Sequence, residues 1–109
     1  MTVYRVQDKT KKGPYTGNHS IGYCEWDRAF HDEFCPGPQR DGIDMLDVDS
    51  GNVVFAFPTF EALHVWFGYE LLMALKGFGY DVVEYEVPNT EVVVSGSRRQ
   101  CVFPKQYLR

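Results

Sequence analysis

The chain has 109 residues, of which 44% are hydrophobic and 16% aromatic, and its formal net charge is −4. This length is typical of one domain, so we expect a single domain over residues 1–109, and the hydrophobic content excludes a disordered chain. No stretch approaches the roughly 18 apolar residues of a membrane-spanning helix, and no apolar segment follows the basic residues of the start, so we expect a cytoplasmic protein without membrane contact.

The first predicted element is a short strand at residues 3–6, where β-branched and aromatic residues follow one another. Residues 8–17 carry glycine and proline in combinations that are typical of turns. Residues 18–52 form the least regular part of the sequence, and Pro36 and Pro38 exclude a helix or a central strand around them. We therefore expect a long irregular segment over residues 18–52.

A buried strand is predicted at residues 52–57, and an amphipathic helix is predicted at residues 59–76. Thr59 is a good N-cap residue, and Gly77 follows the last helical turn as a typical C-terminal stop. Apolar residues recur every three or four positions and should form one buried face, namely Phe60, Leu63, Phe67, Leu71, Ala74 and Phe78.

Three further strands are predicted after the helix, at residues 81–87, 91–94 and 100–103, and residues 95–99 form a plausible hairpin loop between the last two. The predicted fold is therefore α+β, with a mainly antiparallel sheet of about five strands. The long helix should pack on one face of this sheet.

Charge is unevenly distributed along the chain. Residues 25–49 hold eight acidic residues against two basic ones, whereas residues 1–20 and 90–109 each hold four basic residues against one acidic residue. This pattern argues against a general nucleic-acid-binding protein, which needs a basic face, and favours docking onto a basic protein surface. The acidic residues that we assign to such a surface are Asp41, Asp44, Asp47 and Asp49. A solvated acidic loop without a partner is the competing interpretation.

The aromatic residues exceed what one helix and a small sheet must bury. Most of them should belong to the core, and those left on the surface would serve as anchors in an interface. We assign this role to Trp26, Trp66 and Tyr69. The leading hypothesis is therefore a small protein, without a cofactor, that binds a protein partner.

A metal site is a second hypothesis, because His19, Cys24, His31 and Cys35 are all residue types that ligate zinc. No Cys-x-x-Cys pair anchors this set, so ordinary loop residues are the competing interpretation and we predict no metal. The odd number of cysteines, three, is compatible with a reducing compartment.

Four short segments together resemble a minimal ADP-ribosyltransferase-like core. They are Tyr4-Arg5, Phe57-Pro58-Thr59, the strand at residues 82–88, and residues 95–100. The resemblance implies that Arg5 holds the phosphates or ribose of NAD, with Tyr15 and Gln100 completing a nucleotide site. Gln100 stands where that family has a glutamate and carries no negative charge to stabilise a developing cation, so the resemblance implies a catalytically degenerate NAD-binding domain.

The whole chain is also similar in style to small, acidic, aromatic-rich proteins encoded by phages and mobile elements. Many such proteins block a host defence enzyme by binding it. This similarity implies an inhibitory protein–protein interaction and agrees with the leading hypothesis.

Overall fold

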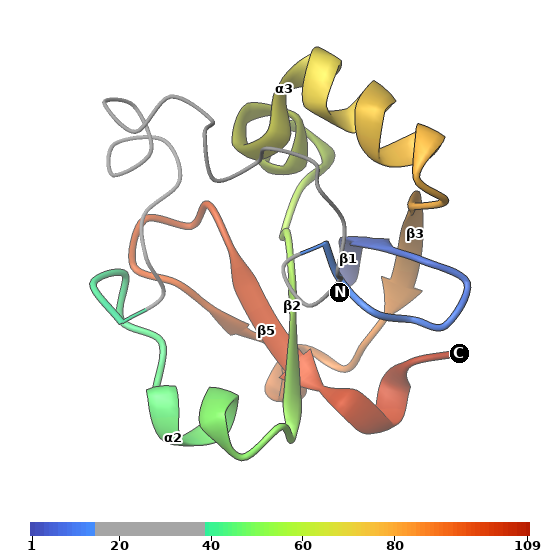
Figure 1. The fold of residues 1–109 in the computed structure, drawn as a ribbon. Coiled ribbons are helices and arrows are strands. Elements are labelled where there is room, and N and C mark those ends of the chain that lie inside the picture. The colour runs from blue at the N-terminus through green and yellow to red at the C-terminus, as the bar shows by residue number, and fades with distance from the viewer. Residues whose placement is uncertain (15–38) are drawn as a thin grey trace.

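The structure, a computed structural model, describes residues 1–14 and 39–109 (Figure 1). Its elements in chain order are β1 (Thr2–Gln7), α2 (Met45–Asp49), β2 (Val53–Ala56), α3 (Phe60–Gly77), β3 (Asp81–Glu86), β4 (Val93–Val94) and β5 (Cys101–Pro104). The α+β class, the five antiparallel strands and the long helix are confirmed. The segment predicted as irregular differs at its end, because residues 45–49 form the short helix α2, with Asp44 as its N-cap. None of the helices described is long and apolar enough to cross a bilayer.

The five strands form two small sheets, where one sheet was predicted. β1 pairs with β3, and β5 pairs with both β2 and β4. One bridge joins the sheets: Tyr4 N–H donates to the Phe57 carbonyl at 2.9 Å, and Phe57 N–H donates to the Tyr4 carbonyl at 2.7 Å. Pairing does not continue along β2, because the Phe55 carbonyl, on the same edge as that of Phe57, accepts from Arg5 Nη1 at 2.6 Å.

Two hydrophobic clusters form the core. The first lies between α3 and one face of the β1–β3 sheet and contains Val6, Phe57, Leu63, Trp66, Phe67, Leu72, Leu75 and Tyr80. The second lies on the opposite face of that sheet and contains Val3, Ala56, Tyr85, Val87, Cys101 and Phe103. The alternation of side chains along β1 explains the division, since Val3 and Val6 point to opposite faces. The prediction that the helix covers one face of the strands is confirmed.

Gly68 interrupts α3. Its φ of 74° and ψ of 161° are not helical, so the helix consists of two parts that meet at an angle (Figure 1). Before Gly68, the predicted residues Leu63 and Phe67 are buried. After it, the buried residues are Leu72 and Leu75, each one position beyond the predicted Leu71 and Ala74. As a result, Ala74 and both ends of the predicted face, Phe60 and Phe78, are exposed. The helix is therefore present over the predicted residues, but its buried face changes position at Gly68, which the predicted single face did not include.

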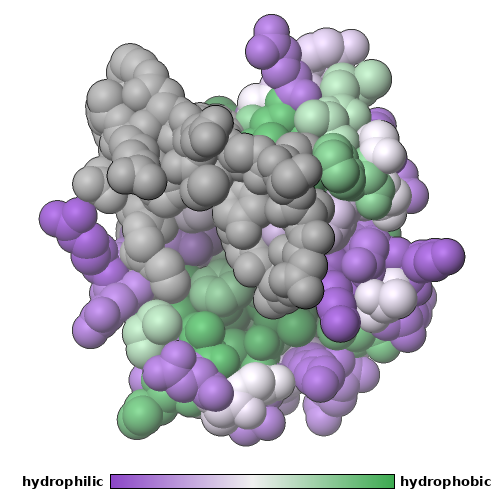
Figure 2. All heavy atoms as spheres, viewed as in Figure 1, coloured by the Kyte–Doolittle hydropathy of each residue, from purple (hydrophilic) through white to green (hydrophobic). Residues whose placement is uncertain are grey.

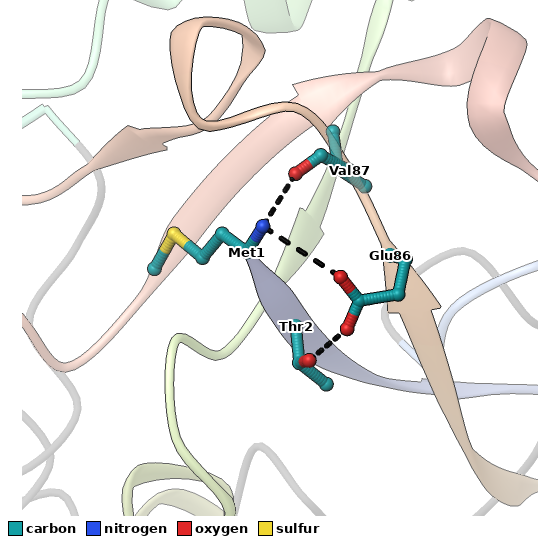
Figure 3. Close-up of polar contacts among 4 residues, drawn as sticks. All are labelled: Met1, Thr2, Glu86 and Val87. Carbon is teal, nitrogen blue, oxygen red and sulfur yellow. Dashed lines mark hydrogen bonds and ion pairs between the residues drawn. The ribbon is translucent and has the colours of Figure 1, made fainter.

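The start of β1 is fastened to the end of β3 (Figure 3). The Met1 amino group donates to the Val87 carbonyl at 2.8 Å and lies 3.7 Å from a carboxylate oxygen of Glu86. The Thr2 hydroxyl donates to the other oxygen of the same carboxylate. These contacts hold β1 in register, and β1 in turn carries Arg5.

Candidate functional site

Arg5, on β1, is a buried charged residue that lines two cavities. It is 7% exposed, and its guanidinium donates to two main-chain carbonyls, that of Phe55 at 2.6 Å and that of Lys11 at 3.2 Å. Its Nε is buried without a hydrogen-bond partner. Burial lowers the pKa of Arg5, although Tyr85 and Asp8 act in the opposite direction. No carboxylate among the described residues forms a salt bridge with this buried cation.

Two adjoining cavities are lined by Arg5. One, of about 270 Å³, has apolar walls that include Val48, Val54 and Phe55. The other, of about 610 Å³, is lined by Arg5 and by three lysines, Lys11, Lys12 and Lys105. Figure 2 shows apolar surface over β2, below the grey atoms, with hydrophilic surface beside it.

The loop after β1 places two of these lysines. Asp8 organises it, because its Oδ1 accepts from Thr10 N–H at 2.8 Å, from the Thr10 hydroxyl at 2.6 Å and from Lys12 N–H at 3.0 Å. The hydrogen bond from the Thr10 side chain, together with the backbone hydrogen bonds, lowers the pKa of Asp8. Lys11 adopts a φ of 70°, which turns the chain so that its carbonyl meets Arg5.

Asp41 is not part of an acidic surface, contrary to the prediction. Its side chain points inward and binds the β4–β5 hairpin: Oδ1 accepts from Ser97 N–H at 2.7 Å, and Oδ2 accepts from the Ser97 hydroxyl at 2.7 Å and from Gln100 Nε2 at 3.0 Å. Burial alone would raise the pKa of Asp41, but the hydrogen bonds from Ser97, Gln100 and Ser95 together outweigh it and lower the pKa. Asp41 is therefore a structural residue that fastens residues 39–44 to the hairpin.

The other acidic residues of the prediction belong to α2. Asp44 is exposed and caps the helix, since its carboxylate accepts from Leu46 N–H at 2.9 Å. Asp49 is exposed at the end of the helix, and Asp47 lies between them in the chain. α2 lies at the opposite end of the molecule from α3 (Figure 1). The acidic residues and Tyr69 therefore do not form one continuous surface.

The two described aromatic anchors have opposite environments. Trp66 is 6% exposed and packs in the first cluster, with its ring centroid 5.5 Å from that of Phe57, so its assignment as a surface anchor was wrong. Tyr69 is 72% exposed, and Met73, one turn further along the same half of α3, is 49% exposed. Trp66 lies before the break at Gly68 and Tyr69 after it, in the half that buries Leu72 and Leu75 and exposes Tyr69 and Met73.

Several predicted site residues lie outside the described residues: Tyr15, His19, Cys24, Trp26, His31 and Cys35. The nucleotide-site residues that are described, Arg5 and Gln100, enter separate hydrogen-bond networks, the first with main-chain carbonyls and the second with Asp41. Within residues 1–14 and 39–109, no group of three or more His, Cys, Asp or Glu side chains is arranged to hold a metal ion.

The convergence of the basic residues was not predicted. Both ends of the chain are basic in the sequence, but no local pattern indicates that Lys105 from one end lines the same cavity as Lys11 and Lys12 from the other. The placement follows from a main-chain hydrogen bond of 2.9 Å from Lys105 N–H to the Asn52 carbonyl, which anchors the residues after β5 next to the start of β2.

A protein-family model described as Bacteriophage T4 Y00F protein matches residues 1–109, so the chain belongs to this family. The match supports the expected similarity to small phage proteins and adds nothing to the resemblance to ADP-ribosyltransferases. A search of curated proteins found no match. A search of solved structures found none either.

Proposed function

We propose that this member of the bacteriophage T4 Y00F family acts by binding a host protein through the outward side of α3, and that the bound surface of the host protein is basic. The observation that carries this proposal is the exposure of Tyr69 and Met73, one helical turn apart on the second half of α3. Side chains four residues apart in a helix are neighbours on its surface, so these two form one apolar area.

The composition of this area suits an interface. Large aromatic and methionine side chains are enriched at the centres of protein interfaces, where they supply most of the binding energy. Val65, on the first half of α3, adds a third exposed apolar side chain. Figure 2 shows apolar surface over α3 at the upper right, interspersed with hydrophilic atoms.

The charge around the area favours a basic partner. Glu61 and Glu70 are exposed on α3, and the whole chain has a formal net charge of −4. Complementary charge at the rim of an interface speeds the encounter and selects the partner, whereas the buried apolar anchors slow dissociation. Asp44 and Asp49 on α2 contribute to the long-range field and lie outside the contact itself.

Such binding would inhibit the partner wherever its basic surface is also its working surface. A phage protein made during infection would meet this partner in the host cytoplasm. The function thus needs no cofactor and no reaction of its own.

Affinity capture from host lysate tests the proposal with two matched baits. Tyr69→Ser/Met73→Ser removes the two apolar side chains of α3, and Leu46→Ser/Val93→Ser removes two exposed apolar side chains from α2 and β4. We expect the wild type and the second variant to retain the same basic protein and the first variant to lose it. With the purified partner, the first variant should weaken affinity by at least about tenfold, as expected of interface anchors. Equal retention by both variants would contradict the proposal.

NAD binding stays a prediction with its own test. If Arg5 and Gln100 form one nucleotide site, calorimetric titration should show NAD binding that both Arg5→Ala and Gln100→Ala abolish. The separate networks of the two residues give no reason to expect that joint effect.

A further inference from the structure

We propose that the cavity lined by Arg5, Lys11, Lys12 and Lys105 binds a small organic phosphate, with the phosphate among the four basic side chains and an apolar portion in the adjoining cavity beside Val54 and Phe55. This site is separate from the α3 surface and does not depend on the function proposed for that surface.

Arg5 is a buried cation whose charge is only partly compensated. A buried charge is costly unless an opposite charge compensates it, and here the guanidinium donates only to neutral carbonyls, those of Phe55 and Lys11. Asp8 and Tyr85 act on it electrostatically, but no carboxylate among the described residues forms a salt bridge with it. An anion in the cavity would add a close negative charge, and the planar guanidinium suits the oxygen atoms of a phosphate.

Basic residues from both ends of the chain line the same cavity. Lys11 and Lys12 follow β1, Lys105 follows β5, and all three line the same cavity as Arg5. No acidic side chain occurs among the described residues that line either cavity. Four positive charges around one hollow attract anions and concentrate them there.

Hydrogen bonds fix the main chain that carries the lysines. Asp8 binds the main chain of Thr10 and Lys12 and keeps the loop folded. The main-chain bond from Lys105 to Asn52 fixes the opposite wall. A pre-formed site loses less entropy when it binds a ligand than a loop that must first become ordered.

The size and the walls of the two cavities indicate the class of ligand. They share Arg5, Gly13, Gly51 and Val54, and the larger one has a volume of about 610 Å³. Sites for small molecules typically measure about 300–1,000 Å³ and combine apolar walls with a few polar groups. A phosphomonoester with a flat or apolar body fits this combination better than a free phosphate ion does.

Calorimetric titration with phenyl phosphate, inorganic phosphate and phenol tests the proposal on the full chain. We expect saturable binding of phenyl phosphate with a dissociation constant of about 1 mM or below, weaker binding of inorganic phosphate, and none of phenol. Phenyl phosphate should also raise the unfolding temperature, because a ligand that binds only the folded state stabilises it.

Two charge-matched variants test the location. Lys11→Gln/Lys12→Gln/Lys105→Gln should weaken phenyl phosphate binding by at least about tenfold. Lys9→Gln/Lys76→Gln/Arg98→Gln removes three exposed charges that do not line the cavity and should change the affinity by less than about twofold. Thermal unfolding of both variants checks that they fold.

Three outcomes would overturn the proposal. The first is the absence of saturable phenyl phosphate binding up to about 10 mM, far weaker than a built site provides. The second is an equal loss in the two charge-matched variants, which would mean a diffuse field rather than a site. The third is tighter binding of a single-stranded oligonucleotide than of phenyl phosphate, with the same lysines required, which would make the cavity part of a nucleic-acid surface.

Discussion

Asp41 and Ser97 are 56 residues apart in the chain, yet the carboxylate of the first receives both the backbone N–H and the hydroxyl of the second, each at 2.7 Å. A further main-chain bond of 2.7 Å, from Gly96 N–H to the Asp41 carbonyl, reinforces this connection. The contact is the main polar tie between residues 39–44 and the β4–β5 hairpin. Asp41, although it belongs to the acidic segment of the sequence, therefore has a structural role.

Replacing Asp41 should therefore destabilise the protein. Asp41→Ala removes three charge-assisted hydrogen bonds, two of them part-buried and the one from Gln100 buried, at a cost of about 3 kcal/mol. Urea unfolding measures the change in the free energy of unfolding. A change below about 0.5 kcal/mol, the size typical of a surface substitution, would contradict the structural role.

The same carboxylate should make stability depend on pH. Because folding lowers the pKa of Asp41, its contribution is complete above the unfolded value of about 3.9 and is lost as the pH falls through the folded pKa. The wild type should therefore lose more stability than Asp41→Asn between about pH 5 and pH 2. The pKa of Asp8 is also lowered, so Asp8→Asn should flatten the pH dependence in the same range, through the loop after β1. Parallel curves for the wild type and Asp41→Asn would count against the assignment.

Gly68 should resist substitution even though alanine favours helices. Its φ of 74° and ψ of 161° belong to a region that is nearly restricted to glycine, so Gly68→Ala should cost about 1–3 kcal/mol. Gly77→Ala is the matched control, because Gly77 has no positive φ and a methyl group at its Cα would meet no atom within 4 Å. That variant should be neutral or stabilising by up to about 1 kcal/mol. If Gly68→Ala stabilised the protein as well, the fold would not require the non-helical conformation at position 68.

Cys101 should not react in the folded protein. Burial raises the pKa of its thiol to about 12, so almost no thiolate is present at neutral pH. Iodoacetamide at pH 8 should leave Cys101 unmodified in the native state and modify it rapidly in urea, as peptide mass spectrometry can show for this position alone. Fast modification under native conditions would mean that the second core cluster opens readily.

Acidic residues near α3 should affect association more than those of α2. Glu61→Gln/Glu70→Gln removes charge beside the proposed contact, so it should slow association with the captured partner and reduce the salt dependence of the rate. Asp44→Asn/Asp47→Asn/Asp49→Asn should slow association less, because α2 lies at the opposite end of the molecule. Stopped-flow mixing at several salt concentrations compares the two. A larger effect of the α2 variant would indicate that the partner contacts α2 rather than α3.

Most of the fold could be predicted from local patterns. The alternation of apolar and polar residues around Tyr85 and the cap at Thr59 are local signals, and both are confirmed. The break at Gly68 also had a signal, a glycine in the middle of a helical pattern, but a lone glycine is tolerated in many helices. Whether it breaks the helix depends on how Leu72 and Leu75 pack, which is a tertiary effect.

The candidate sites were harder to predict for the same reason. Trp66 and Tyr69 are three residues apart and similar in type, yet one is buried and the other is exposed, on either side of the break at Gly68. Lys105 and Lys12 line the same cavity because of the way in which β5 and β1 are placed around β2. No local sequence pattern encodes this placement.

Photocrosslinking from position 69 is the most direct test of the α3 contact. One variant carries a benzophenone amino acid at position 69, and a control variant carries it at the exposed position 93 of β4. Each variant is irradiated in host lysate. We expect position 69 to form a covalent adduct with one basic host protein, and unlabelled wild type to compete with this adduct, while position 93 forms none. An adduct of equal yield from both positions, or none from position 69, would contradict the proposal that α3 carries the binding surface.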